Sequence, residues 1–243
     1  MANSTTNSDF DILADELEKT YGNFDALRGV SLKIKRGEFF TLFGPNGAGK
    51  TTLIKLLATL SAPTSGSLRV FDYDVKNEVQ SIRSIIGVIS HDTYLYENLS
   101  AFENIKFFAQ LYGLSDVDNR VSTVIEQVGL KSRMHDLVRT FSRGMKQRLT
   151  VARAIVHEPK ILLLDEPYTG LDLNGAQIFG EMLSALKSQS RTILMTTHNI
   201  DEGLGLSDRV GILVKGKIVF ESSASDLNSL NFKDLYISKV ENS

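Results

Sequence analysis

Hydrophobic residues recur at two different spacings along this chain, and the spacing changes from segment to segment. From residue 12 to residue 35 the apolar positions lie near period two, with interruptions at Gly22-Asn23 and Gly29, which predicts antiparallel strands. Residues 38–43, 161–164 and 192–196 form short apolar runs without polar alternation, a pattern typical of strands buried on both faces. Since helical patterns separate these runs, we expect their strands to form a mainly parallel sheet.

A stretch with helical spacing interrupts this arrangement between residues 100 and 157. After residue 201, the runs 210–214 and 218–220 flank Lys215-Gly216-Lys217 and predict a hairpin. The expected fold class is therefore α/β, with a mainly parallel central sheet, an antiparallel β edge subdomain and an inserted α-helical subdomain at about residues 92–158. A single domain would cover residues 10–243, and residues 1–9 would form a disordered tail.

The composition limits the partners and the chemistry of the chain. Of its 243 residues, 42% are hydrophobic and 23% are charged, as in ordinary globular domains. The formal net charge of -2, without a basic stripe, argues against nucleic acid as a partner. Cysteine is absent, which excludes disulfides and thiolate metal sites. The sequence begins without a secretory signal pattern, and no apolar run approaches the roughly 18 residues of a membrane span, so we expect a cytoplasmic protein whose membrane role depends on a partner.

The strongest motif is a glycine-rich loop between the apolar run 38–43 and a helical pattern at 51–60. Residues 44–51 read GPNGAGKT and match G-x-x-x-x-G-K-[ST], the phosphate-binding loop of P-loop NTPases. Its glycines let backbone N–H groups approach phosphate, Lys50 would neutralise the β- and γ-phosphates, and the Thr51 hydroxyl suits Mg²⁺. The alternative is an unrelated glycine-rich turn. The predicted ATP-binding residues of this region are Gly44, Pro45, Asn46, Gly47, Ala48, Gly49, Lys50, Thr51 and Thr52.

Two carboxylates end the apolar run 161–164. Asp165 is predicted to hold Mg²⁺, directly or through water, and Glu166, on the opposite side of the strand period, is predicted to activate the attacking water. The alternative is that both acids only begin the loop before Pro167. Beside a phosphate loop, the pair favours ATP hydrolysis, since no arginine-rich lid of the kind found in kinases is evident.

Residues 142–148, SRGMKQR, resemble the signature motif of ABC-type ATPases, and the resemblance extends over about residues 13–240. Ser142 also suits the N-cap of a helix that the pattern predicts at 145–156. The resemblance implies a head-to-tail dimer, in which Ser142 and Gly144 of one subunit meet the γ-phosphate that the other subunit binds. A homodimer is expected once ATP binds, although a pair with a homologue is left open. The alternative is a helix that is merely capped.

Three further positions match motifs of the same family. The resemblance implies that Tyr21 stacks on adenine, that His198 contacts the γ-phosphate and positions water, and that Asp172 lies at the dimer interface. Ordinary structural roles are the alternatives: an edge-strand tyrosine, a structural histidine and a helix N-terminal acid. With Lys50 and Glu166, His198 completes the candidate catalytic set.

The sequence departs from the family pattern in two places. His91 follows the run 86–90, where the family usually has a glutamine that binds Mg²⁺ and water. A neutral imidazole could replace this ligand and a protonated one could not, so ATPase activity is expected to fall below about pH 6.5. Arg143 and Met145 replace the usual glycine and glutamine of the signature, and Arg143 either strengthens nucleotide binding or points into solvent.

The expected function is ATP hydrolysis by an ABC transporter subunit at the cytoplasmic face of the cell membrane, with an integral membrane permease subunit as partner. Residues 94–99, YLYENL, lie where family members dock the permease, unless Tyr94 and Tyr96 pack inside the helical subdomain. The resemblance is nearest to exporters, and among these to the ATPase of the cytochrome c maturation haem exporter. The alternative is an exporter of drugs, lipids or polysaccharides. An ABC ATPase acting on nucleic acid or the ribosome is less well supported, because no coiled coil separates Lys50 from Ser142 and only one ATPase domain is present.

Overall fold

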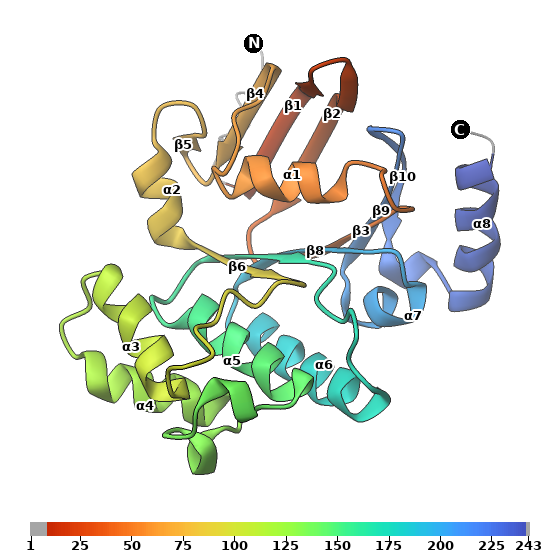
Figure 1. The fold of residues 1–243 in the computed structure, drawn as a ribbon. Helices are drawn as coiled ribbons and strands as arrows, with labels where there is room; N and C mark the ends of the chain where they lie inside the picture. The colour runs from red at the N-terminus through yellow and green to blue at the C-terminus, as the bar shows by residue number, and fades with distance from the viewer. Residues whose placement is uncertain (1–8, 242–243) are drawn as a thin grey trace.

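The computed structural model describes residues 9–241, which form two sheets and the helices that pack on them (Figure 1). Of the expected N-terminal tail, residues 1–8 lie outside the described residues. Asp9 belongs to the fold, because its carbonyl oxygen accepts a 3.0 Å hydrogen bond from the N–H of Arg36. Within residues 9–241, no helix has the length and the apolar character needed to cross a bilayer.

The antiparallel sheet has the strand order β2-β1-β4-β5 and confirms the predicted edge subdomain. Its strands are β1 (Phe10–Tyr21), β2 (Phe24–Lys35), β4 (Ser65–Val70) and β5 (Tyr73–Asp74). The predicted turn at Gly22-Asn23 joins β1 to β2. The predicted interruption at Gly29 is wrong, since β2 continues through this residue; the pairing register shifts there, and Gly29 is the extra residue of a β-bulge.

The larger sheet has the strand order β10-β9-β3-β8-β7-β6 and is parallel apart from the β9–β10 hairpin, as predicted. Its strands are β3 (Phe39–Phe43), β6 (Ile86–Ser90), β7 (Ile161–Asp165), β8 (Thr192–Thr197), β9 (Arg209–Val214) and β10 (Lys217–Ser223). Every residue of β3, β7 and β8 is buried. Burial on both faces explains why these strands lack the polar alternation of the antiparallel sheet.

The register of the parallel strands aligns their carboxyl ends at one edge of the sheet. Phe43 at the end of β3 pairs with Thr197 at the end of β8, and Thr196 pairs with Asp165 at the end of β7. Asp165 also pairs with Ser90 at the end of β6. The residues that follow these strands, at positions 44, 91, 166 and 198, therefore emerge at the same edge.

Helices cover both faces of the parallel sheet. α1 (Lys50–Leu57) lies between the two sheets and shares one hydrophobic core with both of them and with α2 (Val79–Ile85). The opposite face shares a second core with α3 (Ala101–Leu111), α4 (Val117–Gln127), α5 (Arg143–Ile155) and α6 (Leu173–Lys187). The segment predicted to be helical thus contains α3, α4 and α5, seen in green in Figure 1. The helix predicted at 51–60 ends earlier, at Leu57, because Thr59 adopts a φ of 57°.

Two helices lie near the C-terminal end of the described chain, α7 (Ile200–Gly203) and α8 (Ser229–Glu241). Phe232 is fully buried and packs edge-on against Phe43, with ring centroids 5.0 Å apart. This contact fastens α8 to the parallel sheet. Short 3-10 turns complete the fold, η2 (Lys131–Arg133), η3 (Val138–Thr140), η4 (Leu204–Leu206) and η5 (Ala224–Asp226).

Candidate ATP-binding site

Residues 44–49 connect β3 to α1 and form the loop that the motif predicts. Gly49 has a φ of 110°, and a Cβ atom at this position would lie 2.5 Å from the carbonyl oxygen of Ala26, so only glycine fits. Gly49 is also the N-cap of α1 and offers no side chain to cap the helix. The first N–H groups of α1 therefore have no acceptor within the helix. Together with the positive end of the helix dipole, they suit a phosphate group.

Lys50 connects the loop to the acidic end of β7. Its side chain is almost fully buried, and its ammonium group donates to the carbonyl oxygens of Gly44 (2.6 Å) and Pro45 (3.1 Å). The same nitrogen lies 3.1 Å from Oε1 of Glu166. The phosphate loop and the carboxylate pair therefore lie side by side, as predicted. Phosphate oxygens would compete with these three oxygen atoms for the charge of Lys50.

Glu166 links Lys50 to His198. Its Oε2 lies 2.9 Å from Nδ1 of His198 and accepts a 3.4 Å hydrogen bond from the backbone N–H of the same residue. Its Oε1 is buried and, within residues 9–241, has the ion pair with Lys50 but no hydrogen-bond donor. Such an acceptor suits a group that takes a proton from water.

The prediction that strand alternation turns Glu166 away from Asp165 is wrong. β7 ends at Asp165, so Glu166 is outside the strand and does not follow its alternation. Glu166 instead has a φ of 49°, in the left-handed region that few residues other than glycine adopt. This turn directs the carboxylate toward Lys50 and His198. A strained backbone conformation at a candidate catalytic residue is consistent with a functional position.

Asp165 is buried, and its Oδ1 accepts a 2.7 Å hydrogen bond from Oγ1 of Thr196. Thr196 was not among the predicted site residues, since its only signal in the sequence is a hydroxyl at the end of an apolar run. Thr51 is exposed at the start of α1. Mg²⁺ binds carboxylate and hydroxyl oxygens together with phosphate oxygens and water, so Asp165 and Thr51 fit this ion. Within residues 9–241, no three acidic or histidine side chains form a cluster that would hold a metal by themselves.

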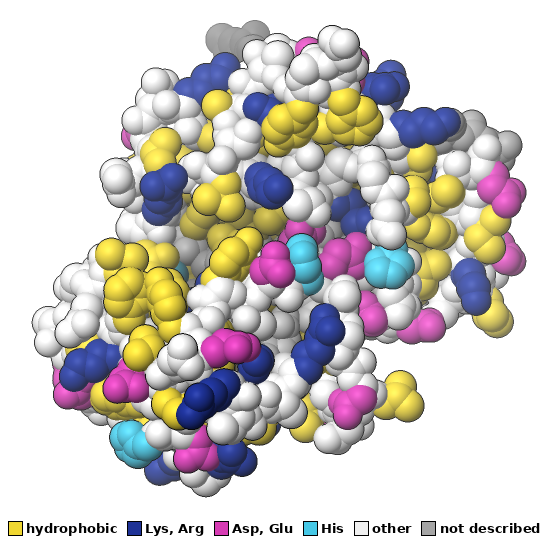
Figure 2. All heavy atoms as spheres, in the orientation of Figure 1, with side chains coloured by type: hydrophobic (Ala, Val, Ile, Leu, Met, Phe, Trp, Pro, Cys, Tyr) yellow, Lys and Arg dark blue, Asp and Glu magenta, His cyan; other side chains and the backbone are white. Residues whose placement is uncertain are grey.

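Two other predicted ligands lie at the surface. His91 directly follows β6, and its Nε2 lies 3.4 Å from Oδ2 of Asp92. Tyr21 ends β1, with Nζ of Lys19 4.8 Å from the centre of its ring. Both side chains are accessible, and their contacts with metal and adenine stay predictions. Figure 2 shows histidine and acidic side chains gathered near the centre of one face of the molecule.

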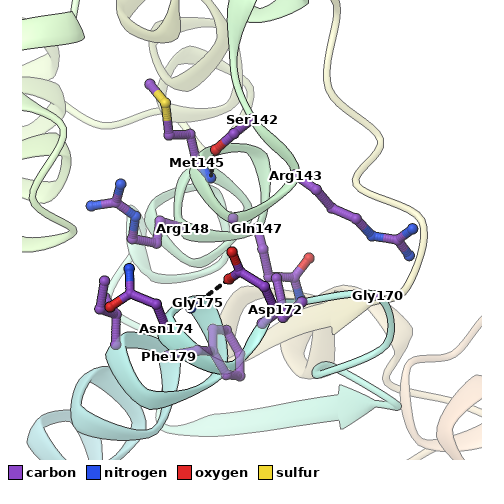
Figure 3. A pocket seen from close by; sticks show the side chains of 13 residues that line it. Ser142, Arg143, Met145, Gln147, Arg148, Gly170, Asp172, Asn174, Gly175 and Phe179 are labelled. Carbon is purple, nitrogen blue, oxygen red and sulfur yellow. Dashed lines mark hydrogen bonds between the residues drawn. The ribbon is translucent and has the colours of Figure 1, made fainter.

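The N-termini of α5 and α6 line a pocket of about 250 Å³ that contains the predicted dimer residues (Figure 3). Ser142 caps α5 by accepting a 3.3 Å hydrogen bond from the N–H of Met145, and Asp172 caps α6 by accepting one of 2.7 Å from the N–H of Gly175. Gly144 lies in the first turn of α5. Within the described chain, no hydrogen bond or ion pair joins the pocket to residues 44–52. Within one chain, the pocket with the predicted dimer residues and the phosphate loop are therefore not bonded to each other.

Arg143 is exposed but does not extend freely into solvent. Its Nη2 donates a 2.8 Å hydrogen bond to the carbonyl oxygen of Thr169, and its guanidinium group covers Gly170. Gly170 has a φ of 74°, and a Cβ atom there would overlap the guanidinium group, so this contact requires glycine. Arg143 therefore ties the start of α5 to the loop that leads into Asp172 (Figure 3).

Residues 94–99 contribute to an exposed apolar surface. Tyr94 and Tyr96 are both exposed, so their packing inside the helical layer is ruled out. The ring of Tyr96 meets that of Phe107 edge-on at 5.4 Å, and further exposed apolar side chains follow on and after α3. We call this group the aromatic surface, and its members are Tyr94, Tyr96, Phe107, Leu111 and Tyr112.

Comparison with known proteins agrees with this geometry. The family model described as ABC transporter matches residues 27–169. The chain is 35% identical over 218 residues to the linearmycin resistance ATP-binding protein LnrL of Bacillus subtilis (strain 168), covering 89% of this chain and 70% of that protein. It is 36% identical over 225 residues to the doxorubicin resistance ATP-binding protein DrrA of Mycobacterium tuberculosis, covering 91% and 68%.

Two solved structures share the fold. The first is cbiO1 from Clostridium perfringens, part of the ABC transporter complex cbiONQ, with a TM-score of 0.83, 26% identity, and coverage of 94% of this chain and 93% of that chain. The second is a dimeric, post-hydrolysis state of the ATP-binding cassette MJ0796 bound to ADP and Pi, with a TM-score of 0.81, 26% identity, and coverage of 88% and 98%.

These likenesses confirm the predicted fold class and the predicted ATP hydrolase. They do not support the finer expectation of a haem exporter, since the relatives reported above are named for resistance to linearmycin and doxorubicin. The matched region contains the phosphate loop, the signature at 142–148 and the acidic pair at 165–166. This chain belongs to the ABC transporter family, as one of its ATP-binding and ATP-hydrolysing members.

Proposed function

We propose that this chain powers an ABC exporter by binding ATP at residues 44–52 and hydrolysing it with Lys50, Glu166 and His198. The contact of these three side chains at the carboxyl edge of the parallel sheet carries the proposal. Lys50 neutralises phosphate charge, Glu166 takes a proton from the attacking water, and His198 holds that water and the γ-phosphate in position. Tyr21 stacks on adenine from the end of β1.

Magnesium is the second component of the proposed substrate. When bound, Mg²⁺ neutralises charge on the phosphate oxygens and lowers the cost of the charge that develops during transfer. Asp165 and Thr51 would hold it, with His91 as a further ligand. We expect EDTA to abolish phosphate release and added MgCl₂ to restore it. His91→Gln should require no more MgCl₂ than the wild type, whereas His91→Ala should require more. Equal MgCl₂ requirements in all three proteins would exclude His91 from the site.

The catalytic assignment is tested by measuring phosphate release and ATP binding separately. Glu166→Gln should release phosphate roughly 10²- to 10⁴-fold more slowly while still binding ATP, because it loses only the proton acceptor. Lys50→Ala should lose ATP binding itself. Glu181→Gln is a matched control, since Glu181 is an exposed acid on α6 whose side chain accepts a hydrogen bond from Gln177. Hydrolysis by Glu166→Gln at the wild-type rate would refute the assignment.

The proposal includes a second ATPase subunit. Ser142, Gly144 and Asp172 line a pocket that no hydrogen bond or ion pair among the described residues joins to residues 44–52, and a related cassette has been solved as a dimer. The pocket of one copy would therefore complete the ATP site of the other. Glu166→Gln with MgATP should elute as a dimer in size-exclusion chromatography, and the added change Ser142→Arg should return it to a monomer. A monomer in both cases would contradict a shared site.

We infer that an integral membrane permease docks on the aromatic surface and holds the chain at the cytoplasmic face of the membrane. Exposed aromatic side chains are common anchors of protein interfaces. The names of the relatives favour a drug or antibiotic as cargo over haem. An affinity-tagged chain should copurify with an integral membrane protein from detergent-solubilised membranes, and Tyr96→Ala should reduce this recovery without changing ATPase activity. Loss of cytochrome c maturation with normal drug resistance in cells lacking the chain would favour haem instead.

A further inference from the structure

The turn that carries His198 is held by a carboxylate four residues further along the chain. Glu202, in α7, accepts a 3.1 Å hydrogen bond from Oγ1 of Thr197 at its Oε2 and a 2.9 Å hydrogen bond from Nδ2 of Asn199 at its Oε1. Thr197 and Asn199 are the two sequence neighbours of His198. One carboxylate thus accepts hydrogen bonds from the side chains of both sequence neighbours of the histidine.

Further hydrogen bonds within this turn depend on the same side chains. Oγ1 of Thr197 accepts from the N–H of Asn199 (3.1 Å), and Oδ1 of Asn199 accepts from the N–H of Asp201 (3.1 Å). α7 has only four residues, which is too short for a helix to be stable by itself. The position of the turn therefore depends on these side-chain bonds rather than on helix formation.

The ring of His198 is not fixed by packing. Its side chain is 54% exposed, and among residues 9–241 Glu166 bonds this residue twice, with Oε2 lying 2.9 Å from Nδ1 and 3.4 Å from the backbone nitrogen. Thr197, by contrast, is fully buried at the end of β8. The hydrogen bond from Thr197 to Glu202 therefore fixes the exposed turn relative to the rigid sheet.

The surroundings of Glu202 shift its pKa in opposite directions, and the net shift is upward. Burial raises the pKa of Glu202, whereas the hydrogen bonds from Thr197 and Asn199 and the nearby His198 lower it, and the charge of Glu166 raises it further. Tyr168 also faces this carboxylate, and the pKa of its phenol is raised by burial and by the charge of Glu202. A phenol that stays neutral adds no negative charge beside the pair of glutamates.

We propose that Glu202 is a positioning residue for ATP hydrolysis: it holds Thr197 and Asn199 so that the imidazole of His198 faces Glu166. Glu202 does not touch the nucleotide and acts through His198. The inference rests on the proposed roles of His198 and Glu166. A glutamine at position 202 would keep the shape but could not accept from both donors in the same way, because its amide nitrogen is a donor.

The test compares Glu202→Gln in two backgrounds. In the otherwise wild-type protein, loss of one such hydrogen bond should lower kcat by about tenfold and leave KM for ATP unchanged. In a His198→Ala background, the same change should cause no further loss. Asp201→Asn is the matched control, since Asp201 is an exposed acid of the same helix and its replacement should leave kcat unchanged.

A spectroscopic measurement separates positioning from general damage to the fold. The chain has four histidines, and the imidazole signals of His198 can be assigned by their loss in His198→Ala. In Glu202→Gln the signals of His198 should shift, while those of His91, His135 and His157 should not. This readout remains available even where the His198→Ala background is too slow to assay.

The possible results distinguish the inference from the function on which it rests. An equal loss of kcat in both backgrounds, or unshifted His198 signals, would overturn the role of Glu202. Wild-type kcat in Glu202→Gln together with a strong loss in His198→Ala would overturn the role of Glu202 alone. Full activity of His198→Ala would overturn both this inference and the proposed role of His198.

Discussion

Replacing Thr196 with valine tests whether the hydroxyl that holds Asp165 serves the metal site. Valine keeps the shape of a fully buried side chain in β8 and removes the donor that lies 2.7 Å from Oδ1 of Asp165. A hydrogen bond to an ionised group contributes about 1.5–3 kcal/mol, so the variant should lose that much of its unfolding free energy. Removing a residue that orients a metal ligand typically weakens metal binding by about 10- to 100-fold, or about 1.4–2.7 kcal/mol.

Thr192 offers a matched control on the same strand. It is fully buried at the start of β8, where its hydroxyl donates to Oδ2 of Asp11 (2.5 Å) and accepts from the N–H of Gly37 (2.8 Å). Thr192→Val therefore removes a similar buried bond at the opposite end of the strand. We expect it to lower stability at least as much as Thr196→Val and to leave the requirement for Mg²⁺ unchanged.

Two assays separate the effects. Urea unfolding followed by circular dichroism gives the loss of stability, and phosphate release titrated with MgCl₂ at a fixed ATP concentration gives the half-maximal MgCl₂ concentration. Thr196→Val should shift this concentration upward by about 10- to 100-fold. An unshifted titration in Thr196→Val, or an equal shift in Thr192→Val, would refute the idea that the hydroxyl acts through the metal ligand.

Three further changes test other parts of the structure. Phe232→Ala should lower the unfolding free energy by about 3–5 kcal/mol in chemical denaturation, because Phe232 is fully buried against Phe43; unchanged stability would contradict the docking of α8. Arg143→Lys should speed hydrogen–deuterium exchange in the loop at Thr169, because lysine lacks the planar guanidinium group that covers this loop. Unaltered exchange would show that Arg143 does not hold the loop. Burial lowers the pKa of His157 in the folded protein. Below about pH 6.5, His157 is therefore protonated more readily in the unfolded chain than in the folded protein. The wild type should then lose stability relative to His157→Phe as pH falls, by at most about 1.4 kcal/mol per pH unit, and parallel pH profiles would exclude this effect.

Local patterns predicted most of the regular structure, and the exceptions have local physical causes. The runs 38–43, 161–164 and 192–196 became β3, β7 and β8, because burial on both faces leaves a continuous apolar signature. The bulge at Gly29 and the early end of α1 were missed. In both cases a single residue departs from the regular backbone, and hydrophobic spacing contains no information on such a departure.

The sequence by itself determined the chemistry of the site, because each motif is contiguous. Residues 44–51 specify a loop that suits phosphate, and residues 161–166 specify a buried strand that ends in two acids. Neither motif determines how far apart the two lie in the folded protein. Only the parallel register of β3, β8 and β7 brought Lys50 within 3.1 Å of Glu166 and His198 within 2.9 Å of it.

Tertiary structure alone also decided which residues support the site. Thr196 holds Asp165 across two neighbouring strands, and Arg143 holds a loop 26 residues away. Their residue types are common on any protein surface or strand, so no motif marks them. The physical reason is that a hydrogen bond depends on distance and direction in space, which the chain acquires only when separate strands and helices pack together.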